Sequence, residues 1–235
     1  MYRYILFDLD NTLLDFNKAE AISISAVLDS YGINATPEII ENYSKINLSC
    51  WKRFEKGEIG RSDIFKDRVN LLGDSLGSKF DYLEFTKKYV NVLSHQGHTF
   101  PDTLPLLQTL RKKGYKMAAA TNGSLIPQTG RIVASGIAGF FDSGIFISEV
   151  VGHKKPEPEF FKFVLNKIGI SDKSQVLMIG DSLSGDILGA VGSGIDSCFV
   201  DFGGETLPVG ETLPVSCKAT YIVNSLKDII PICGL

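Results

Sequence analysis

The chain has 235 residues, 44% of them hydrophobic, and its 24 basic and 27 acidic side chains leave a net charge of −3. This composition allows a sizeable buried core, and the mixed charges exclude a broad basic surface for nucleic acids or anionic lipids. No apolar run reaches the roughly 20 residues that a membrane helix requires, and the N-terminus lacks a signal-peptide pattern. The four cysteines form no C-x-x-C motif, which favours packed thiols in a reducing compartment. We therefore expect a cytoplasmic protein, with a monomer favoured, that binds neither nucleic acid nor membranes.

The first predicted element is a strand at 3–8, with the sequence RYILFD. From residue 17 to residue 95 the pattern changes, because apolar residues recur at helical spacing and no convincing strand interrupts them. Glycines and Pro37 separate the helical stretches. An all-helical block inside an alternating chain indicates an inserted second domain. Its helices are expected at 18–31, 37–56, 61–72 and 80–94.

From residue 96 on, strand-like and helix-like segments alternate along the chain. Short runs rich in Val, Ile and Phe favour buried strands, and the amphipathic stretches between them favour helices. Such alternation predicts an α/β fold with a three-layer, Rossmann-like parallel sheet core, formed by residues 1–16 and 96–235, into which the all-helical domain 17–95 is inserted. The strands are expected at 115–120, 144–148, 175–180, 196–201 and 220–223, and the helices at 102–113, 125–135, 158–168 and 184–193.

A short repeat stands near the C-terminus, where GETLPV at 204–209 recurs at 210–215. Six residues are too few for a repeat architecture. The Gly and Pro content favours a surface loop, and we expect a local duplication without a function of its own.

Two aspartates follow the first strand in the stretch FDLDNTLLDF. Asp8 and Asp10 are two residues apart, so on a strand their side chains project from the same face. Two unit charges about 4 Å apart repel by roughly 1 to 4 kcal/mol, which calls for a reason to keep them together. A carboxylate can bind Mg²⁺ or attack phosphorus as a nucleophile, and a neighbouring carboxyl can transfer a proton. A lone D-x-D pair is nevertheless more often a solvated acidic turn.

Three further polar motifs lie at or near predicted strand ends. Thr121 and Asn122, in TNG, offer hydrogen-bond donors to phosphate oxygens, and Lys155, in GHKKPEPEFF, offers a positive charge. Asp181, in IGDSLSGD, suits a metal ligand, and Asp186 suits a supporting role that orients Asp181 or its loop. Taken singly, each motif has a simpler reading as a helix cap, a solvated lysine or an acid at a helix start. Because ligands bind beyond the carboxyl ends of parallel strands, we expect all of these motifs to converge there.

In this order, FDLDNT, TNG, KP and GDSLSGD resemble the haloacid dehalogenase superfamily, and the resemblance covers the α/β part of the chain. It implies a phosphotransfer enzyme in which Asp8 is the nucleophile and Asp10 is the general acid and base. It also implies that residues 17–95 form a helical cap domain that closes over the site.

The same resemblance implies how the substrate and a metal are bound. Thr121, Asn122 and Lys155 would hold the phosphoryl group, and the cofactor would be Mg²⁺. The residues that would bind Mg²⁺ are Asp8, Asp181 and the main-chain carbonyl of Asp10.

FDLDNTLLDF, INLSCWKRFEKGEIGR and ISEVVGHKKPEPEFF together resemble one branch of this superfamily, which contains phosphatases of non-canonical pyrimidine nucleotides. The branch implies a phosphomonoesterase for a small phosphorylated metabolite, namely a pyrimidine nucleoside 5′-monophosphate. Asn47, Trp51 and Arg68 are the cap residues that this resemblance singles out. Trp51 and Phe54 stand at helical spacing, which is more often a core pattern than a base-stacking surface.

Other functions stay open on the same residues. Haloacid dehalogenases lack the second aspartate, so Asp10 argues against that reaction. A phosphatase or phosphomutase of sugar phosphates keeps both aspartates and agrees with the core motifs. A phosphonatase requires a reactive cap lysine, and no lysine is marked out for that role. A non-catalytic phospholigand-binding protein would be expected to have lost a catalytic group, and none is missing.

Overall fold

The protein is built around a six-stranded parallel sheet, seen in a computed structural model that describes residues 2–203 and 218–234. The strand order is β3-β2-β1-β4-β5-β6. All predicted strands are present, and every strand end lies within one residue of its expected position. The GETLPV repeat lies outside the described residues. The strands are β1 (Tyr4–Phe7), β2 (Lys116–Thr121), β3 (Ile145–Ile147), β4 (Val176–Gly180), β5 (Asp196–Val200) and β6 (Tyr221–Val223).

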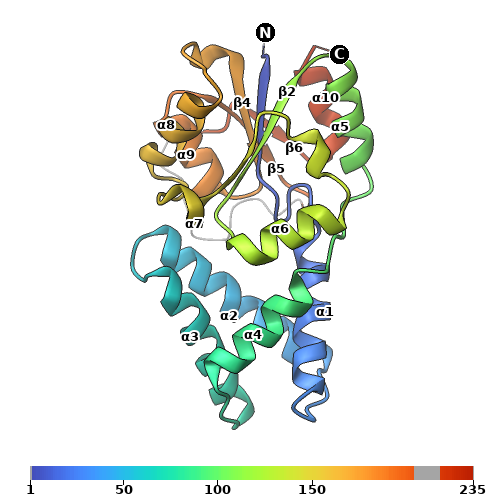
Figure 1. Ribbon diagram of the computed structural model, residues 1–235, viewed down its shortest axis with the longest axis vertical. Coiled ribbons are helices and arrows are strands. Elements are labelled where there is room, and N and C mark those ends of the chain that lie inside the picture. The colour runs from blue at the N-terminus through green and yellow to red at the C-terminus, as the bar shows by residue number, and fades with distance from the viewer. Residues whose placement is uncertain (1, 204–217, 235) are drawn as a thin grey trace. The chain divides into compact units, whose positions relative to one another are not determined.

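Helices cover both faces of this sheet, as Figure 1 shows. α8 (Pro158–Lys167) and α9 (Leu188–Gly192) lie on one face, and α5 (Thr103–Lys112) and α10 (Ile229–Ile232) lie on the other. Side chains of alternate strand residues pack under α8, as expected for a period of two residues. The predicted three-layer α/β core is therefore confirmed. The buried residues between the sheet and α8 are Leu6, Ala118, Ala120, Val176 and Met178 from the strands and Phe160, Phe161, Val164 and Leu165 from the helix.

The register of the central strands brings their carboxyl ends to one level. Phe7 pairs with Ala119 of β2 on one side and with Ile179 of β4 on the other. The residues that follow these strands therefore leave the sheet side by side. Asp8 is the next residue after Phe7, so it emerges between the ends of β2 and β4.

The chain divides into two compact units. The α/β unit contains Met1–Asp15, Thr99–Leu125 and Ser135–Leu235, and the helical unit contains Phe16–His98 and Ile126–Ala134. The expected domain borders, with a cap at 17–95, stay a prediction.

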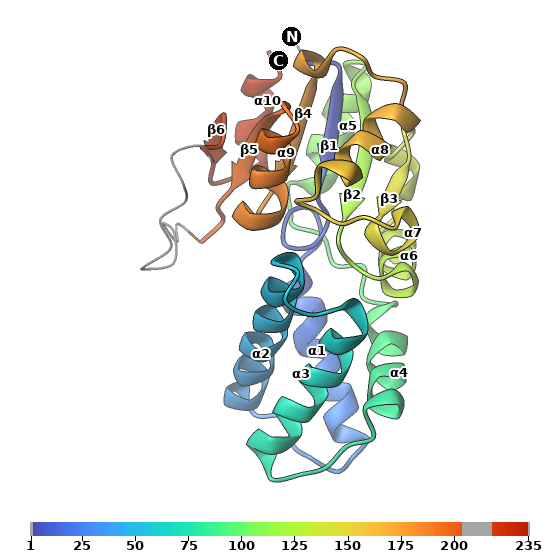
Figure 2. The same ribbon diagram turned by 90° about the vertical axis from the view of Figure 1, so that its left-hand side faces the viewer.

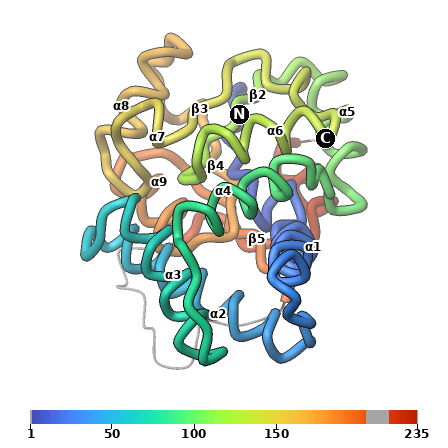
Figure 3. The backbone as a smooth tube through the Cα atoms, turned by 60° about the horizontal axis from the view of Figure 1, so that its bottom comes forward, coloured from blue at the N-terminus to red at the C-terminus, as the bar shows by residue number. Residues whose placement is uncertain are grey.

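Four helices make up most of the helical unit, and Figures 2 and 3 show them packed alongside one another. Each of the four packs against two of the others. Thr36 and Asp81 cap the second and the fourth helix by accepting hydrogen bonds from the main-chain N–H groups three residues further on. None of the described helices is both long and apolar enough to span a membrane. The helices are α1 (Phe16–Asp29), α2 (Pro37–Glu55), α3 (Arg61–Leu76) and α4 (Tyr82–Leu93).

A fifth helix, α6 (Leu125–Ala134), follows β2 and belongs almost entirely to the helical unit. The sequence predicts it for the α/β core, because it follows a strand there, and that border stays a prediction. Two contacts tie the helix to the end of the preceding helical stretch. A Cβ atom on Gly130 would lie 2.4 Å from the carbonyl oxygen of Ser94, so only glycine allows this approach. Arg131 donates from Nε to the carbonyl of Gln96 at 3.2 Å, and its guanidinium lies 5.2 Å from the ring centroid of Phe16.

Candidate active site

A buried lysine, Lys155, lies at the centre of the charged residues that the sequence singles out. Its ammonium group has three N–H donors, and three acceptors lie 2.6 Å from Nζ: Oδ1 of Asp8, Oδ1 of Asp186 and the carbonyl oxygen of Ala120. Burial alone would lower the pKa of Lys155, but the carboxylates of Asp186 and Asp8 more than offset this and hold the pKa above its usual range. Lys155 is therefore a fixed positive charge.

The main chain of Lys155 is held by Asn122, which follows β2. Oδ1 of Asn122 accepts a hydrogen bond from the N–H of Lys155 at 2.8 Å, and Nδ2 donates to its carbonyl at 2.8 Å. The peptide bond between Lys155 and Pro156 is cis. Ser148 donates from its hydroxyl to the main-chain carbonyl of Asn122 at 3.1 Å. The ends of β2 and β3 thus both contribute to the placement of the lysine loop.

Asp181 follows β4 and is oriented by Thr12, which the turn after β1 carries back to it. The Thr12 hydroxyl accepts from the Asp181 N–H at 3.1 Å and donates to Oδ1 of Asp181 at 3.1 Å. The turn is tight, because the N–H groups of Leu13 and Leu14 both donate to the carbonyl of Leu9. Asn11 adopts a φ of 58° there, a left-handed conformation that asparagine tolerates better than most residues. The stretch FDLDNT therefore supplies both an acid and the hydroxyl that positions a second acid.

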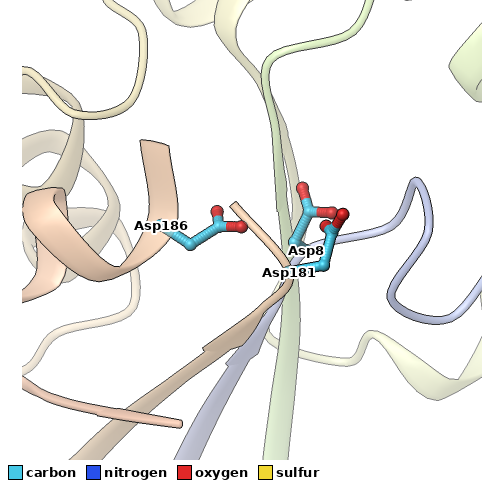
Figure 4. Close-up of side chains that lie close together, drawn as sticks. All are labelled: Asp8, Asp181 and Asp186. Atoms are coloured by element: carbon cyan, nitrogen blue, oxygen red, sulfur yellow. The ribbon is translucent and has the colours of Figure 1, made fainter. Parts of the chain in front are cut away.

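Three carboxylates meet beside Lys155, and Figure 4 shows Asp8, Asp181 and Asp186 turned toward one another. One oxygen from each lies within 4.8 Å of the others. Burial raises the pKa of Asp8 to about 7; Lys155 opposes that rise, and the charges of Asp186 and Asp10 add to it. Burial, with the charges of Asp8 and Asp186, raises the pKa of Asp181 well above its usual value. Three acids against one lysine leave an excess of negative charge, which a bound cation would stabilise.

The hydrogen bonds separate these three acids into two kinds. Both oxygens of Asp186 are engaged, one by Lys155 and the other by the N–H of Ser182 at 3.1 Å. Oδ1 of Asp8 accepts from Lys155, and Oδ1 of Asp181 accepts from Thr12. No hydrogen bond from another described residue reaches the second oxygen of either carboxylate. One oxygen of Asp8 and one oxygen of Asp181 are thus available to a further ligand. Such an all-oxygen donor set fits a hard divalent cation such as Mg²⁺.

Asp10 and Thr121 lie at the same end of the sheet. The charge of Asp10 raises the pKa of Asp8, so the two carboxyls are close, and Asp10 itself is half-buried. Thr121 is the last residue of β2, and its hydroxyl oxygen accepts from the N–H of Gly123 at 3.0 Å. The structure thus brings the residues of the four core motifs to one end of the sheet, whereas Asn47, Trp51 and Arg68 lie in the helical unit. Their individual catalytic roles stay predictions.

Sequence reasoning missed three residues that shape this site: Thr12, Ser182 and Gly180. Thr12 stands in the FDLDNT motif, but the sequence pattern alone assigned no role to its hydroxyl. A hydroxyl directly after an acidic pair is the signal that could have found it. Gly180 is needed because a Cβ atom there would lie 2.2 Å from Oδ2 of Asp186. The first glycine of the IGDSLSGD motif, Gly180, therefore leaves room for the side chain of Asp186.

A model of the haloacid dehalogenase-like hydrolases matches residues 2–194 of the chain. The chain belongs to this family. The family resemblance that the sequence motifs indicated is thereby confirmed, and the hydrolase has relatives along its whole length. A pyrimidine 5′-nucleotidase, PynA of Streptococcus pneumoniae, is 32% identical over 229 residues, which are 97% of this chain and 94% of PynA. Another pyrimidine 5′-nucleotidase, YjjG of Escherichia coli, is 28% identical over 96% of this chain and 95% of YjjG.

One solved structure is similar to this hydrolase in both sequence and fold. It is the crystal structure of the putative HAD-hydrolase YfnB from Bacillus subtilis bound to magnesium. The TM-score is 0.90 at 29% sequence identity, and the match covers 100% of this chain and 99% of YfnB. The likeness supports the fold described above over its full length.

Proposed function

We propose that this hydrolase is a Mg²⁺-dependent phosphomonoesterase that acts on pyrimidine nucleoside 5′-monophosphates through an aspartyl-phosphate at Asp8. The observation that carries the proposal is the state of the Asp8 carboxylate. It is buried at the end of the central strand, one oxygen is fixed by Lys155, and the other accepts no hydrogen bond from the described residues. An oriented carboxylate with one open oxygen, beside a fixed positive charge, is suited to attack on a phosphorus atom.

The available oxygens of Asp8 and Asp181, with the main-chain carbonyl of Asp10, would hold Mg²⁺. The bound ion would neutralise charge on the carboxylates and on the phosphoryl oxygens, which lets two anions approach each other. Thr12 and Asp186 would keep the ligands in place, because they bond to Asp181 and to the lysine that orients Asp8.

The reaction has two displacements at phosphorus. In the first, an oxygen of Asp8 forms a bond to phosphorus while the bond to the nucleoside oxygen breaks, and the Asp10 carboxyl gives its proton to that leaving oxygen. Thr121 would hold another phosphoryl oxygen, and Lys155, whose three N–H donors are already bonded, would stabilise the phosphoryl charge through its fixed positive charge. In the second, the Asp10 carboxylate takes a proton from water, whose oxygen attacks phosphorus and releases phosphate and the Asp8 carboxylate. The products are the nucleoside and inorganic phosphate, and the enzyme returns to its starting state.

One observation supports the substrate class. PynA and YjjG, which are named pyrimidine 5′-nucleotidases, match almost the whole chain, including the helical unit. Phosphate transfer itself requires only residues of the α/β unit, so the substrate class is the more demanding part of the proposal.

The proposal is tested by phosphate release from a panel of substrates with Mg²⁺ and with EDTA. The panel sets UMP, dUMP, dTMP and a halogenated pyrimidine nucleotide against purine nucleotides, phosphoglycolate and sugar phosphates. We expect kcat/KM for the pyrimidine nucleotides to exceed the others by about tenfold or more, which corresponds to roughly 1.4 kcal/mol. EDTA should abolish release and Mg²⁺ should restore it.

Two controls separate the parts of this proposal. Asp8→Asn keeps the shape of the side chain and should remove turnover, whereas Asp228→Asn, at an exposed position, should leave it unchanged. Release at the wild-type rate from Asp8→Asn would overturn the mechanism. An absence of preference for pyrimidines would remove only the substrate class, and isomerised sugar phosphate without free phosphate would indicate a phosphomutase.

A further inference from the structure

The amide side chain of Asn122 is hydrogen-bonded on both of its polar atoms to the main chain of Lys155. We propose that Asn122 is a positioning residue that acts through Lys155, setting where the ammonium group stands relative to Asp8, and does not contribute through a direct contact with the phosphoryl group. This inference rests on the proposed function, because it assigns a role within the same reaction. It also revises the sequence-based expectation that Asn122 holds the phosphoryl group.

The side chain of Asn122 bonds to both polar main-chain groups of Lys155. The N–H and the C=O of Lys155 both bond to the carboxamide of Asn122, each at 2.8 Å, across 33 positions of the chain. Asn122 is 9% exposed and Lys155 is 2% exposed, so water competes little for these bonds. A shorter side chain at position 122 would leave two buried main-chain groups without these partners, and the lysine loop would have to move to find others.

Residues at the end of β2 bond to both the main chain and the ammonium group of Lys155. The carbonyl of Ala120 accepts from the ammonium group at 2.6 Å, and Asn122, two residues later, holds the main chain. The flexible stem of the lysine is therefore fixed at its base and at its tip by the same short stretch. A shift of the base is transmitted to the tip, where the ammonium meets Asp8 at 2.6 Å.

Asn122 is itself held in place by a hydrogen bond to its main chain. The buried hydroxyl of Ser148 donates to its main-chain carbonyl at 3.1 Å. Asn122 directly follows β2 and Ser148 directly follows β3, so the ends of two neighbouring strands fix the position of Asn122. Rigid support of this kind is what a residue needs when it positions a catalytic group to within a fraction of an ångström.

The test is a double-mutant cycle of Asn122→Ala and Lys155→Met, followed by phosphate release and by unfolding. In the wild-type background we expect Asn122→Ala to lower kcat by about 10- to 100-fold, the size of effect that small misplacements produce. In the Lys155→Met background, where no ammonium is left to misplace, Asn122→Ala should change kcat less than about twofold. The midpoint of urea unfolding should fall in both backgrounds, because the main-chain bonds to Asn122 exist in both.

Asn166→Ala, at an exposed position of α8, is the matched control and should alter neither quantity. Losses that multiply in the double variant would show a direct contact with substrate and overturn the inference, as would an unchanged kcat for Asn122→Ala alone. If Lys155→Met is too slow to measure, the affinity for inorganic phosphate replaces kcat in the same cycle, with the same two outcomes. A wild-type protein that neither releases nor binds phosphate would instead overturn the proposed function, so the two failures are distinguishable.

Discussion

Lys155 in the α/β unit and Arg68 in the helical unit are both buried cations, 2% and 4% exposed, but their surroundings differ. Each of the three N–H groups of Lys155 has an acceptor at 2.6 Å, and two of the acceptors are carboxylates. Arg68 donates from Nη1 to Oδ1 of Asn47 at 3.2 Å, and Asn47 in turn donates to Glu20 at 2.6 Å. A neutral amide, that of Asn47, thus lies between the charge of Arg68 and the carboxylate of Glu20.

The helical unit also leaves buried polar atoms without hydrogen bonds. Nε of Arg68 has no hydrogen-bond partner among the described residues, and the hydroxyls of Tyr43 and Tyr89, which interact with each other, make no well-formed hydrogen bond there. The guanidinium lies 4.6 Å from the ring centroid of Tyr89, a cation–π contact that offsets part of its desolvation. A cation whose donors are all bonded is fixed in place, whereas one with an unused donor can still take a further acceptor. The comparison therefore predicts different responses when each network is broken.

The largest expected effect is on the saturated network, in Asp186→Asn. The carboxylate of Asp186 accepts from Lys155 with one oxygen and from the N–H of Ser182 with the other, and an amide keeps only one of these acceptors. The substitution breaks a buried charge pair, but Asp8 still pairs with the ammonium, so we expect the free energy of unfolding to fall by about 3 kcal/mol, the lower end of the range for such pairs. Urea unfolding measures it, with Asp228→Asn as an exposed control expected within about 0.5 kcal/mol of wild type. A fall below about 1 kcal/mol would show that the ammonium finds another partner.

A smaller loss is expected for Arg68→Met in the unsaturated network. Methionine keeps much of the apolar stem and removes the guanidinium, which leaves Oδ1 of Asn47 without that donor. We expect the free energy of unfolding to fall by about 1 to 3 kcal/mol, the range for one buried polar group left unpaired. Arg53→Met is the matched control, because Arg53 pairs with Asp67 at the surface, where such pairs contribute about 0 to 1 kcal/mol. Equal losses from the two variants would contradict a special role of the buried network.

The contrast also explains what the sequence could predict. The central strands β1, β2 and β4 were located to within one residue because their apolar runs are buried on both faces and are bounded by polar residues. Asp8 and Asp181 were found because each directly follows such a run, so local pattern and chain order sufficed. Asp186 was expected to orient Asp181 or its loop, and that role stays a prediction; its bond to Lys155 is visible only in the three-dimensional structure.

The other features of the site and of the helical unit depend on contacts between residues far apart in the chain, which no local sequence pattern predicts. Thr12 meets Asp181 across 169 positions of the chain. Glu20 reads as an ordinary surface acid on an amphipathic helix, yet it is buried because Asn47, 27 positions away, supplies a donor. α6 follows a strand like other helices of the core, and its contacts with the helical unit, such as the approach of Gly130 to Ser94, are not visible in the sequence pattern.

The smallest effect is expected where a buried hydroxyl makes no well-formed hydrogen bond, in Tyr89→Phe. Such a hydroxyl has lost its hydration without gaining a well-formed hydrogen bond, so its removal should change the free energy of unfolding by no more than about 0.5 kcal/mol. Thr12→Val provides the contrast, because the Thr12 hydroxyl both donates to Asp181 and accepts from it. That variant should lose about 1 to 3 kcal/mol by the same urea measurement. A loss above about 1 kcal/mol for Tyr89→Phe would mean that its hydroxyl is paired in solution, and the distinction between a saturated and an unsaturated network would then no longer hold.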